Sequence, residues 1–193
     1  MTATVRLTVH DLESLPDPLD DTRYELIDGE LHVSRQPDYE HQAVCQELQR
    51  QLGNWSKDTD SGQVLPALGV IFTPEAAVAP DVVWIRRERL AEALGEDRKL
   101  HAAPDLVVEV LSPGPRNEQR DRELKLALYS RYGVLEYWIV DWRARQISIY
   151  RRENAALRLV STLHEIDTLH SPLLPGFTCN VQDIFADLLD LHR

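Results

Sequence analysis

The sequence predicts an α/β protein with a mixed central sheet, flanked by helices and preceded by an N-terminal hairpin. Residues 24–33 alternate around the dipeptide Asp28-Gly29, which suits a two-residue hairpin turn. Residues 41–55 carry apolar side chains at helical spacing. Residues 105–111 form an apolar run typical of a strand covered on both faces. The order hairpin, helix, strands, helix and strands favours a mixed sheet covered by helices.

The chain has 193 residues, and we expect one domain that spans residues 1–193. Its composition, 43% hydrophobic and 27% charged residues, is that of a globular protein. No apolar run approaches the roughly 20 residues that span a bilayer, so no membrane partner is expected. The start of the chain lacks the pattern of a signal peptide. Cys45 and Cys179 are isolated and without metal-ligand spacing, which favours a cytoplasmic protein with cysteines that serve as small apolar side chains.

In the first half of the chain, a short helix is expected from Asp11 until Pro16 and Pro18 end it. Strand alternation in the hairpin places Glu25 and Ile27 on one face. The next helix follows Asp38, a suitable N-cap. Its expected core-facing stripe consists of His41, Val44, Leu48, Leu52 and Trp55. The following elements are expected as strands at 64–72 and 81–85 and a surface helix between 86 and 94.

In the second half, Ser112-Pro-Gly-Pro115 ends the strand at 105–111. A helix is then expected from Asn117 to about Tyr132, where Gly133 stops it. Asn180 is the expected cap of a last helix. Further strands are expected at 136–141 and 146–150, with residues 157–160 pairing back on them.

The net charge of −11 counts against a protein that coats DNA, which would carry a basic surface. Any nucleic acid must therefore meet a local basic patch. Arg116, Arg120 and Arg122 surround the 112–115 loop and could supply it. The alternative is a solvated helix start in which these arginines pair with Glu118 and Asp121.

Glu109 is the most informative residue, because burying an ionised carboxylate in so apolar a strand is costly unless it is paired or binds a metal. Asp105 lies on the same face but four residues away, roughly 13 Å, too far to share one metal. Asp81 opens the neighbouring apolar run and is the natural partner. Two such carboxylates can bind Mg²⁺, which lowers the pKa of a bound water and stabilises charge on a phosphate. The alternative, that Asp81 and Asp105 are strand-start residues and Glu109 forms a salt bridge, is equally compatible with the spacing.

Lys125 lies on the expected helix, where Leu124, Ala127 and Leu128 are expected to mark the inward side. We expect a stripe along the edge of this helix, formed by Asp121, Lys125, Leu128 and Tyr132. Lys125 could there contact a phosphate or orient the attacking water. The alternative is an ion pair with Asp121, four residues earlier.

Two other groups of residues are weaker candidates for the functional site. His41 could touch a phosphate, although a packed or capping histidine is the more common case. Trp84, Trp138 and Trp142 are expected in the core or an interface rather than as platforms that stack on bases.

An ordered set of motifs resembles the Uma-two family of bacterial endonuclease-like proteins, which belong to the PD-(D/E)XK superfamily. The motifs are Tyr24-Glu-Leu-Ile-Asp-Gly-Glu, Ala79-Pro-Asp-Val, Pro104-Asp-Leu-Val-Val-Glu-Val-Leu-Ser-Pro113, Lys125 and Glu136-Tyr-Trp-Ile-Val-Asp141. The resemblance runs from about residue 10 to residue 186. It implies a restriction-endonuclease-like fold with a four-stranded mixed core and a phosphodiesterase site that depends on Mg²⁺ or Mn²⁺.

The resemblance also implies roles for individual residues. Asp81 matches the strand aspartate of the superfamily and Glu109 its second acid, so these two would hold the metal. The usual lysine position, two residues after the second acid, is Leu111 here, and Lys125 on the following helix takes its place. Glu25 matches a family glutamate and would be a further metal or water contact, or alternatively an exposed hairpin residue.

The leading hypothesis is an Mg²⁺-dependent endonuclease that hydrolyses phosphodiester bonds in DNA. Cleavage of both strands of a duplex would favour a homodimer, because two sites are then needed. A catalytically inactive binding or interaction protein on the same scaffold is the alternative, and RNA or a nucleotide is an alternative substrate. Basic walls around Glu109 would favour the nuclease, whereas an acidic or filled site would favour the binding protein.

Overall fold

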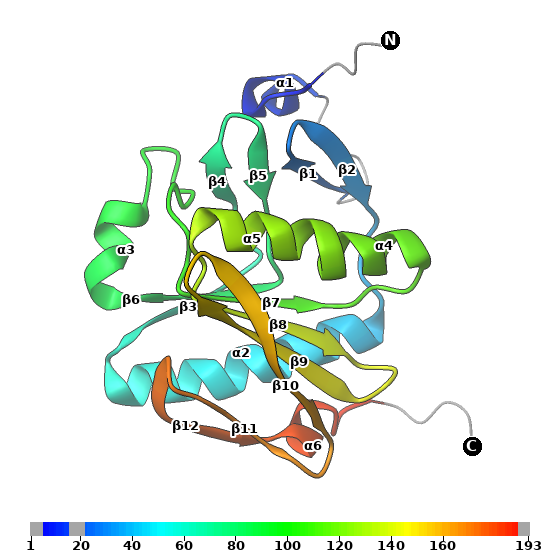
Figure 1. Ribbon diagram of the computed structural model, residues 1–193, viewed down its shortest axis with the longest axis vertical. Helices are drawn as coiled ribbons and strands as arrows, with labels where there is room; N and C mark the ends of the chain where they lie inside the picture. Colours follow the sequence, from blue (N-terminus) through cyan, green and yellow to red (C-terminus); the bar gives the residue numbers. More distant parts are fainter. Residues whose placement is uncertain (1–5, 16–21, 189–193) are drawn as a thin grey trace.

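The computed structural model describes residues 6–15 and 22–188. It is an α/β fold in which helices cover a central six-stranded mixed sheet (Figure 1), so the predicted fold class is confirmed. None of the helices in these two ranges is both long enough and apolar enough to cross a membrane.

The central sheet has the strand order β10-β9-β8-β7-β6-β3 and extends beyond the four-stranded core that the resemblance implies. β7 and β8 run parallel, and the other neighbouring pairs are antiparallel. β7 is buried along its whole length, as expected for a strand covered on both faces. The strands are β3 (Gly62–Pro66), β6 (Val82–Arg86), β7 (Leu106–Val110), β8 (Glu136–Asp141), β9 (Gln146–Glu153) and β10 (Ala156–His164).

One face of this sheet packs against the long helix α2 (Tyr39–Thr59). The Asp38 carboxylate caps α2 by accepting a hydrogen bond from the His41 backbone N–H. The predicted stripe faces the core, with Trp55 only partly buried. The same face is covered by the hairpin of β11 (Thr168–Ser171) and β12 (Leu174–Asn180) and by α6 (Val181–Ile184), which begins after Asn180 as predicted. Neither β11 nor β12 was predicted.

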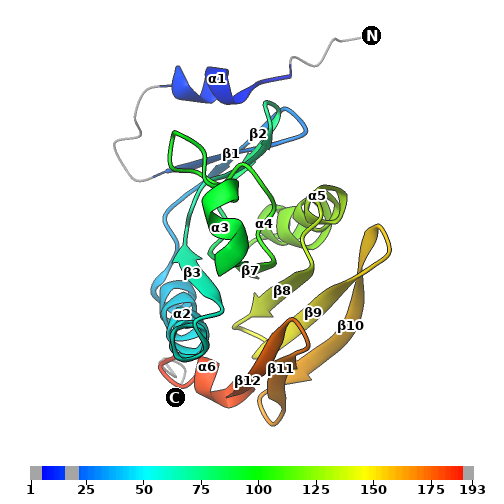
Figure 2. The same ribbon diagram turned by 90° about the vertical axis from the view of Figure 1, so that its left-hand side faces the viewer.

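The opposite face packs against a helical run and a second, four-stranded sheet (Figure 2). The run consists of α4 (Pro115–Gln119), a π-helical turn η1 (Arg120–Lys125) and α5 (Leu126–Tyr132), and it ends at Gly133 as predicted. The second sheet has the order β2-β1-β5-β4. Its strands are β1 (Arg23–Ile27), β2 (Glu30–Ser34), β4 (Val70–Thr73) and β5 (Ala76–Val78).

The N-terminal hairpin of β1 and β2 is confirmed. Asp28 and Gly29 connect the strands with φ of 52° and 78°, the positive values that a primed turn requires. The short helix before it, α1 (Val9–Glu13), begins earlier than predicted because Thr8, not Asp11, is the N-cap. Pro16 and Pro18 lie outside the described residues.

The single strand predicted at 64–72 is wrong. β3 and β4 belong to different sheets, and the chain turns between them at Ala67, where φ is 45°. Both halves are apolar because both are partly covered, so the pattern alone shows no break. The surface helix appears as α3 (Arg87–Ala93), and β10 pairs back on β9 as expected.

Candidate metal and phosphate site

Strand register brings Asp81 and Glu109 together. Val82 of β6 lies opposite Val108 of β7 in an antiparallel pair, so Asp81, just before β6, faces Glu109. The Val110 backbone N–H also donates to Asp81 Oδ2 over 2.9 Å. Asp81 is 7% exposed and Glu109 is 2% exposed, so the two carboxylates share a buried position.

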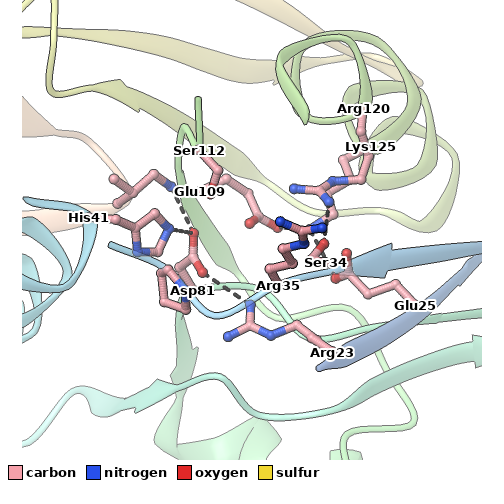
Figure 3. A pocket seen from close by; sticks show the side chains of 12 residues that line it. Arg23, Glu25, Ser34, Arg35, His41, Asp81, Glu109, Ser112, Arg120 and Lys125 are labelled. Atoms are coloured by element: carbon pink, nitrogen blue, oxygen red, sulfur yellow. Dashed lines mark hydrogen bonds and ion pairs between the residues drawn. The ribbon is translucent and has the colours of Figure 1, made fainter. Parts of the chain in front are cut away.

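Asp81 is held by two cationic or polar side chains (Figure 3). Arg23 Nη1 lies 3.1 Å from Oδ1, and His41 Nε2 lies 3.1 Å from Oδ2. Burial alone would raise the pKa of Asp81, but the hydrogen bond and charge of His41, with the charges of Lys125 and Arg23, hold it well below its usual range. Asp81 is therefore a carboxylate at neutral pH.

Lys125 bridges two acids. Its Nζ lies 2.9 Å from Glu109 Oε1, 2.9 Å from Glu25 Oε1 and 3.8 Å from Asp121 Oδ1. The ion pair with Asp121 thus exists but is the longest of the three. Burial alone would lower the pKa of Lys125, yet Glu109, Glu25 and Asp121 together raise it above its usual value. Lys125 consequently keeps its proton.

Glu109 receives two hydrogen bonds on the same oxygen. Lys125 Nζ and the Tyr129 hydroxyl both donate to Oε1, over 2.9 and 2.7 Å. Burial raises the pKa of Glu109, and the charges of Asp81, Asp121 and Glu25 raise it further to about 8, although Lys125 opposes this. Several carboxylates that share a buried site raise the pKa of one of them, and nearby cations oppose this.

Glu25 is a buried member of this cluster, so its alternative as an exposed hairpin residue is wrong. It is 1% exposed, and its Oε1 accepts a 2.9 Å hydrogen bond from the Ala79 backbone N–H. Burial would raise its pKa, but Lys125 and Arg120 lower it overall. β5 pairs with β1 on the side away from β2, so β1 lies inside the second sheet, which the hairpin pattern alone does not reveal.

The helical run presents charged residues to the core. Arg120, Asp121 and Lys125 of η1 are buried. Of the predicted inward side, Leu128 is buried, but Leu124 and Ala127 are exposed, so that prediction is wrong for these two residues. The buried carboxylates of the strands attract the charged stripe inward, and this outweighs the apolar pattern. π turns occur mostly as single turns inside α-helices and often mark functional sites.

The cluster lines a pocket of about 30 Å³ whose walls carry both cationic and acidic side chains. Its cationic residues are Arg23, Arg35, Arg120 and Lys125, and its acids are Glu25, Asp81 and Glu109. Figure 3 shows these side chains converging from β1, the 34–37 loop, η1 and β7. In a protein with a net charge of −11, this pocket thus has one more cationic than acidic side chain among these residues.

Of the three arginines predicted as a basic patch, only Arg120 lines the pocket, and it pairs with Asp121 over 2.9 Å. Arg122 pairs with Asp141 over 3.1 Å, and Arg116 is exposed. Arg122 thus neither lines the pocket nor pairs with Glu118 or Asp121, so both predictions for this residue are wrong.

Two other predicted alternatives are resolved. Asp105 is a structural strand-start residue, buried and paired with Arg89 Nη1 over 2.8 Å. Trp84 and Trp138 are core residues, and Trp142 is partly buried against the same cluster, as expected.

His41, Cys45 and Asp81 form a second group of potential ligands, whose atoms lie within 4.8 Å of one another. Cys45 Sγ is 3.5 Å from His41 Nδ1. Burial strongly raises the pKa of the Cys45 thiol, so it stays protonated and is a poor metal ligand. Hard oxygen ligands are available instead from Asp81 and Glu109, which suits Mg²⁺ or Mn²⁺.

Sequence reasoning missed Arg23, Tyr129 and the contact of His41 with Asp81. Arg23 begins a strand and Tyr129 lies on a helix, and neither interrupts an apolar run. For His41, the sequence did contain a signal that it points toward the core. His41 and Cys45 of α2 are four residues apart and so share a face of the helix.

The chain matches the Uma2 family, described as "Putative restriction endonuclease", over residues 9–182. The chain belongs to the Uma2 family. This confirms the family that the motifs resemble. No functionally curated protein matches the chain.

One solved structure supports the fold of this Uma2 protein, and a second shows a weaker likeness. One, from Anabaena variabilis ATCC 29413, is described as a putative nuclease belonging to DUF820. It is 18% identical, covers 93% of this chain and 98% of that one, and has a TM-score of 0.74. Another, the type IIG restriction endonuclease BpuSI, is 15% identical, with a TM-score of 0.43 over 79% of this chain and 16% of that one.

Proposed function

We propose that this Uma2 protein is a metal-dependent endonuclease that hydrolyses phosphodiester bonds in DNA. The observation that carries the proposal is the pairing of Asp81 and Glu109 in one pocket with four cationic side chains. Carboxylate oxygens can bind a hard cation, and the cationic side chains beside them can contact a phosphate.

Asp81 and Glu109 would hold Mg²⁺, or Mn²⁺ in its place. When bound, the metal would activate water and stabilise charge on the phosphate. The donor set fits, because both residues offer carboxylate oxygens, and Asp81 is ionised at neutral pH. A pocket of about 30 Å³ also has room for a small ion or a water molecule.

The neighbouring residues would fix this arrangement and supply charge. Lys125 keeps its proton, so we assign it the role of a hydrogen-bond donor and positive charge beside the phosphate or the attacking water, not that of a general base. Glu25 holds Lys125 from the opposite side, and Tyr129 fixes the orientation of Glu109. Arg23, Arg35 and Arg120 would receive backbone phosphates.

Three wider features belong to the proposal. Residues 1–193 form one domain, two copies act as a homodimer when both strands of a duplex are cut, and the protein works in the cytoplasm. The two free, buried cysteines suit a reducing compartment.

The proposal is tested by metal titration calorimetry and plasmid nicking on Asp81→Asn, Glu109→Gln and Lys125→Met, with circular dichroism as a check of folding. Both acid variants should lose more metal affinity than the roughly 10- to 100-fold typical of an outer-shell change, and all three should lose nicking. Asp97→Asn removes an acid that lies away from the pocket and should match the wild type. Nicking that survives in Glu109→Gln would rule out the assigned roles.

One observation favours a catalytically inactive binding protein as the second candidate. Within the described structure, Asp81, Glu109 and Glu25 each already contact a protein cation. If folded wild-type protein binds neither Mg²⁺ nor Mn²⁺ and nicks no DNA, this candidate replaces the nuclease.

A further inference from the structure

The guanidinium of Arg23 lies against Asp81, one of the two acids proposed to hold the metal. Arg23 is the first residue of β1 and reaches Asp81 from the second sheet, on the side away from His41 (Figure 3). Its Nη1 donates to Asp81 Oδ1 over 3.1 Å and to the Ala79 carbonyl over 2.9 Å. The guanidinium therefore anchors one oxygen of the expected metal ligand.

Both oxygens of Asp81 are engaged, but not equally firmly. Oδ2 is held by His41 and by the Val110 backbone, and the side chain of His41 is only 5% exposed. Oδ1 is held by Arg23, whose side chain is 31% exposed. Arg23 can thus swing toward solvent on its long side chain, whereas His41 is fixed within α2 and the core.

A divalent cation and a guanidinium compete for the same oxygen. Mg²⁺ binds carboxylate oxygens at about 2.0–2.1 Å, and its double charge would repel a guanidinium that remained on Oδ1. Since Arg23 also lines the pocket with Arg35 and Arg120, a displaced guanidinium stays at the pocket rim. There it can meet an anion.

We propose that Arg23 is the counter-ion of Asp81 in the metal-free protein, that a divalent cation displaces it, and that the freed guanidinium contacts a phosphate of the substrate. The inference rests on the proposed function, since it requires a metal at Asp81. It assigns Arg23 two successive partners and makes metal binding and DNA binding mutually favourable.

The matched test compares Arg23→Gln with Arg35→Gln in Mn²⁺ titration calorimetry. Each variant removes one arginine from the pocket, but of these two arginines only Arg23 pairs with Asp81 in the described part of the chain. Arg23→Gln should bind Mn²⁺ about tenfold more tightly than the wild type, whereas Arg35→Gln should change affinity far less. Thermal unfolding checks that both variants are folded.

A second measurement follows the phosphate contact. The affinity for a short DNA duplex is measured by fluorescence anisotropy in Ca²⁺, which takes the same oxygen ligands. In the wild type, Ca²⁺ should strengthen DNA binding, and in Arg23→Gln this strengthening should be largely lost.

The outcomes separate the two proposals. Suppose that the wild type binds Mn²⁺ and nicks DNA, so that the proposed nuclease function stands. The displacement of Arg23 by the metal is then overturned if Arg23→Gln binds Mn²⁺ no more tightly than the wild type. It is also overturned if Arg35→Gln tightens Mn²⁺ binding as much as Arg23→Gln does. If Ca²⁺ strengthens DNA binding by Arg23→Gln as it does for the wild type, the phosphate contact is overturned. If no folded variant binds metal, both proposals fail.

Discussion

At the scale of single residues, Lys125 is a fully buried cation that two buried acids share. Its side chain is 1% exposed and lies between Glu25 and Glu109, whose side chains are 1% and 3% exposed. Removing one partner of a buried ion pair leaves uncompensated charge in the core, and this is costlier than replacing the whole group. Stability and chemistry are therefore linked at this residue.

We expect Lys125→Met to lower the free energy of unfolding by about 3–5 kcal/mol, because Glu25 and Glu109 would be buried without their shared cation. Urea denaturation monitored by circular dichroism measures the change. Lys99→Met is the control: its ion pair with Asp97 is 3.9 Å long and well exposed, and its loss should cost less than about 1 kcal/mol. Equal losses in both variants would contradict the prediction.

The sequence revealed the acids of the candidate site better than their partners. Asp81 and Glu109 could be selected because a charge in an apolar strand needs a partner, and the strand register does bring them together. Arg23 and Tyr129 could not, because their partners are set by how the two sheets and α5 pack. The catalytic and binding roles of these residues remain predictions, which the experiments described above test.

At the scale of elements, local chemistry decided which structures were predictable. The hairpin turn at Asp28-Gly29 and the cap at Asp38 are short-range features, and both appear as expected. The change of sheet at Ala67 and the π turn at Arg120–Lys125 depend on distant contacts and were missed. Tertiary packing thus overrode the local pattern at both positions.

Two glycines provide a matched pair for testing the helices. Gly53 lies inside α2 and Gly133 ends α5, and a Cβ would meet nothing within 4 Å at either position. Gly133 has a φ of 94°, which alanine adopts only with strain. Gly53→Ala should therefore stabilise by about 0.5–1 kcal/mol, and Gly133→Ala should destabilise by about 1–2 kcal/mol. Thermal or urea unfolding measures the change in the free energy of unfolding for each variant. A change of the same sign in both variants would contradict the prediction.

At the scale of the whole molecule, the net charge of −11 leads us to expect that the proposed DNA contact is confined to the pocket and its rim. Counterion release gives a slope of about −0.9 per neutralised phosphate when the logarithm of affinity is plotted against that of salt concentration. A general DNA-binding surface would give a much steeper slope.

With Arg23, Arg35 and Arg120 as the contacting cations, we expect a slope of about −2 to −3, measured by fluorescence anisotropy in Ca²⁺. Arg35→Gln should reduce its magnitude by about one. A slope near −10 would show that a second basic surface binds DNA, and a slope near zero would show that the pocket does not.

The site lies where the two sheets meet, and its residues come from distant parts of the chain. Glu25 belongs to β1, Asp81 precedes β6, Glu109 lies in β7, and Lys125 ends η1. A ribosome needs roughly 5 to 20 s to translate from Glu25 to Lys125. During that time the nascent polypeptide has acids without their cation. The nuclease that we propose would therefore become able to cleave only late in synthesis, and a prematurely terminated polypeptide that lacks Lys125 would be harmless to the DNA around it.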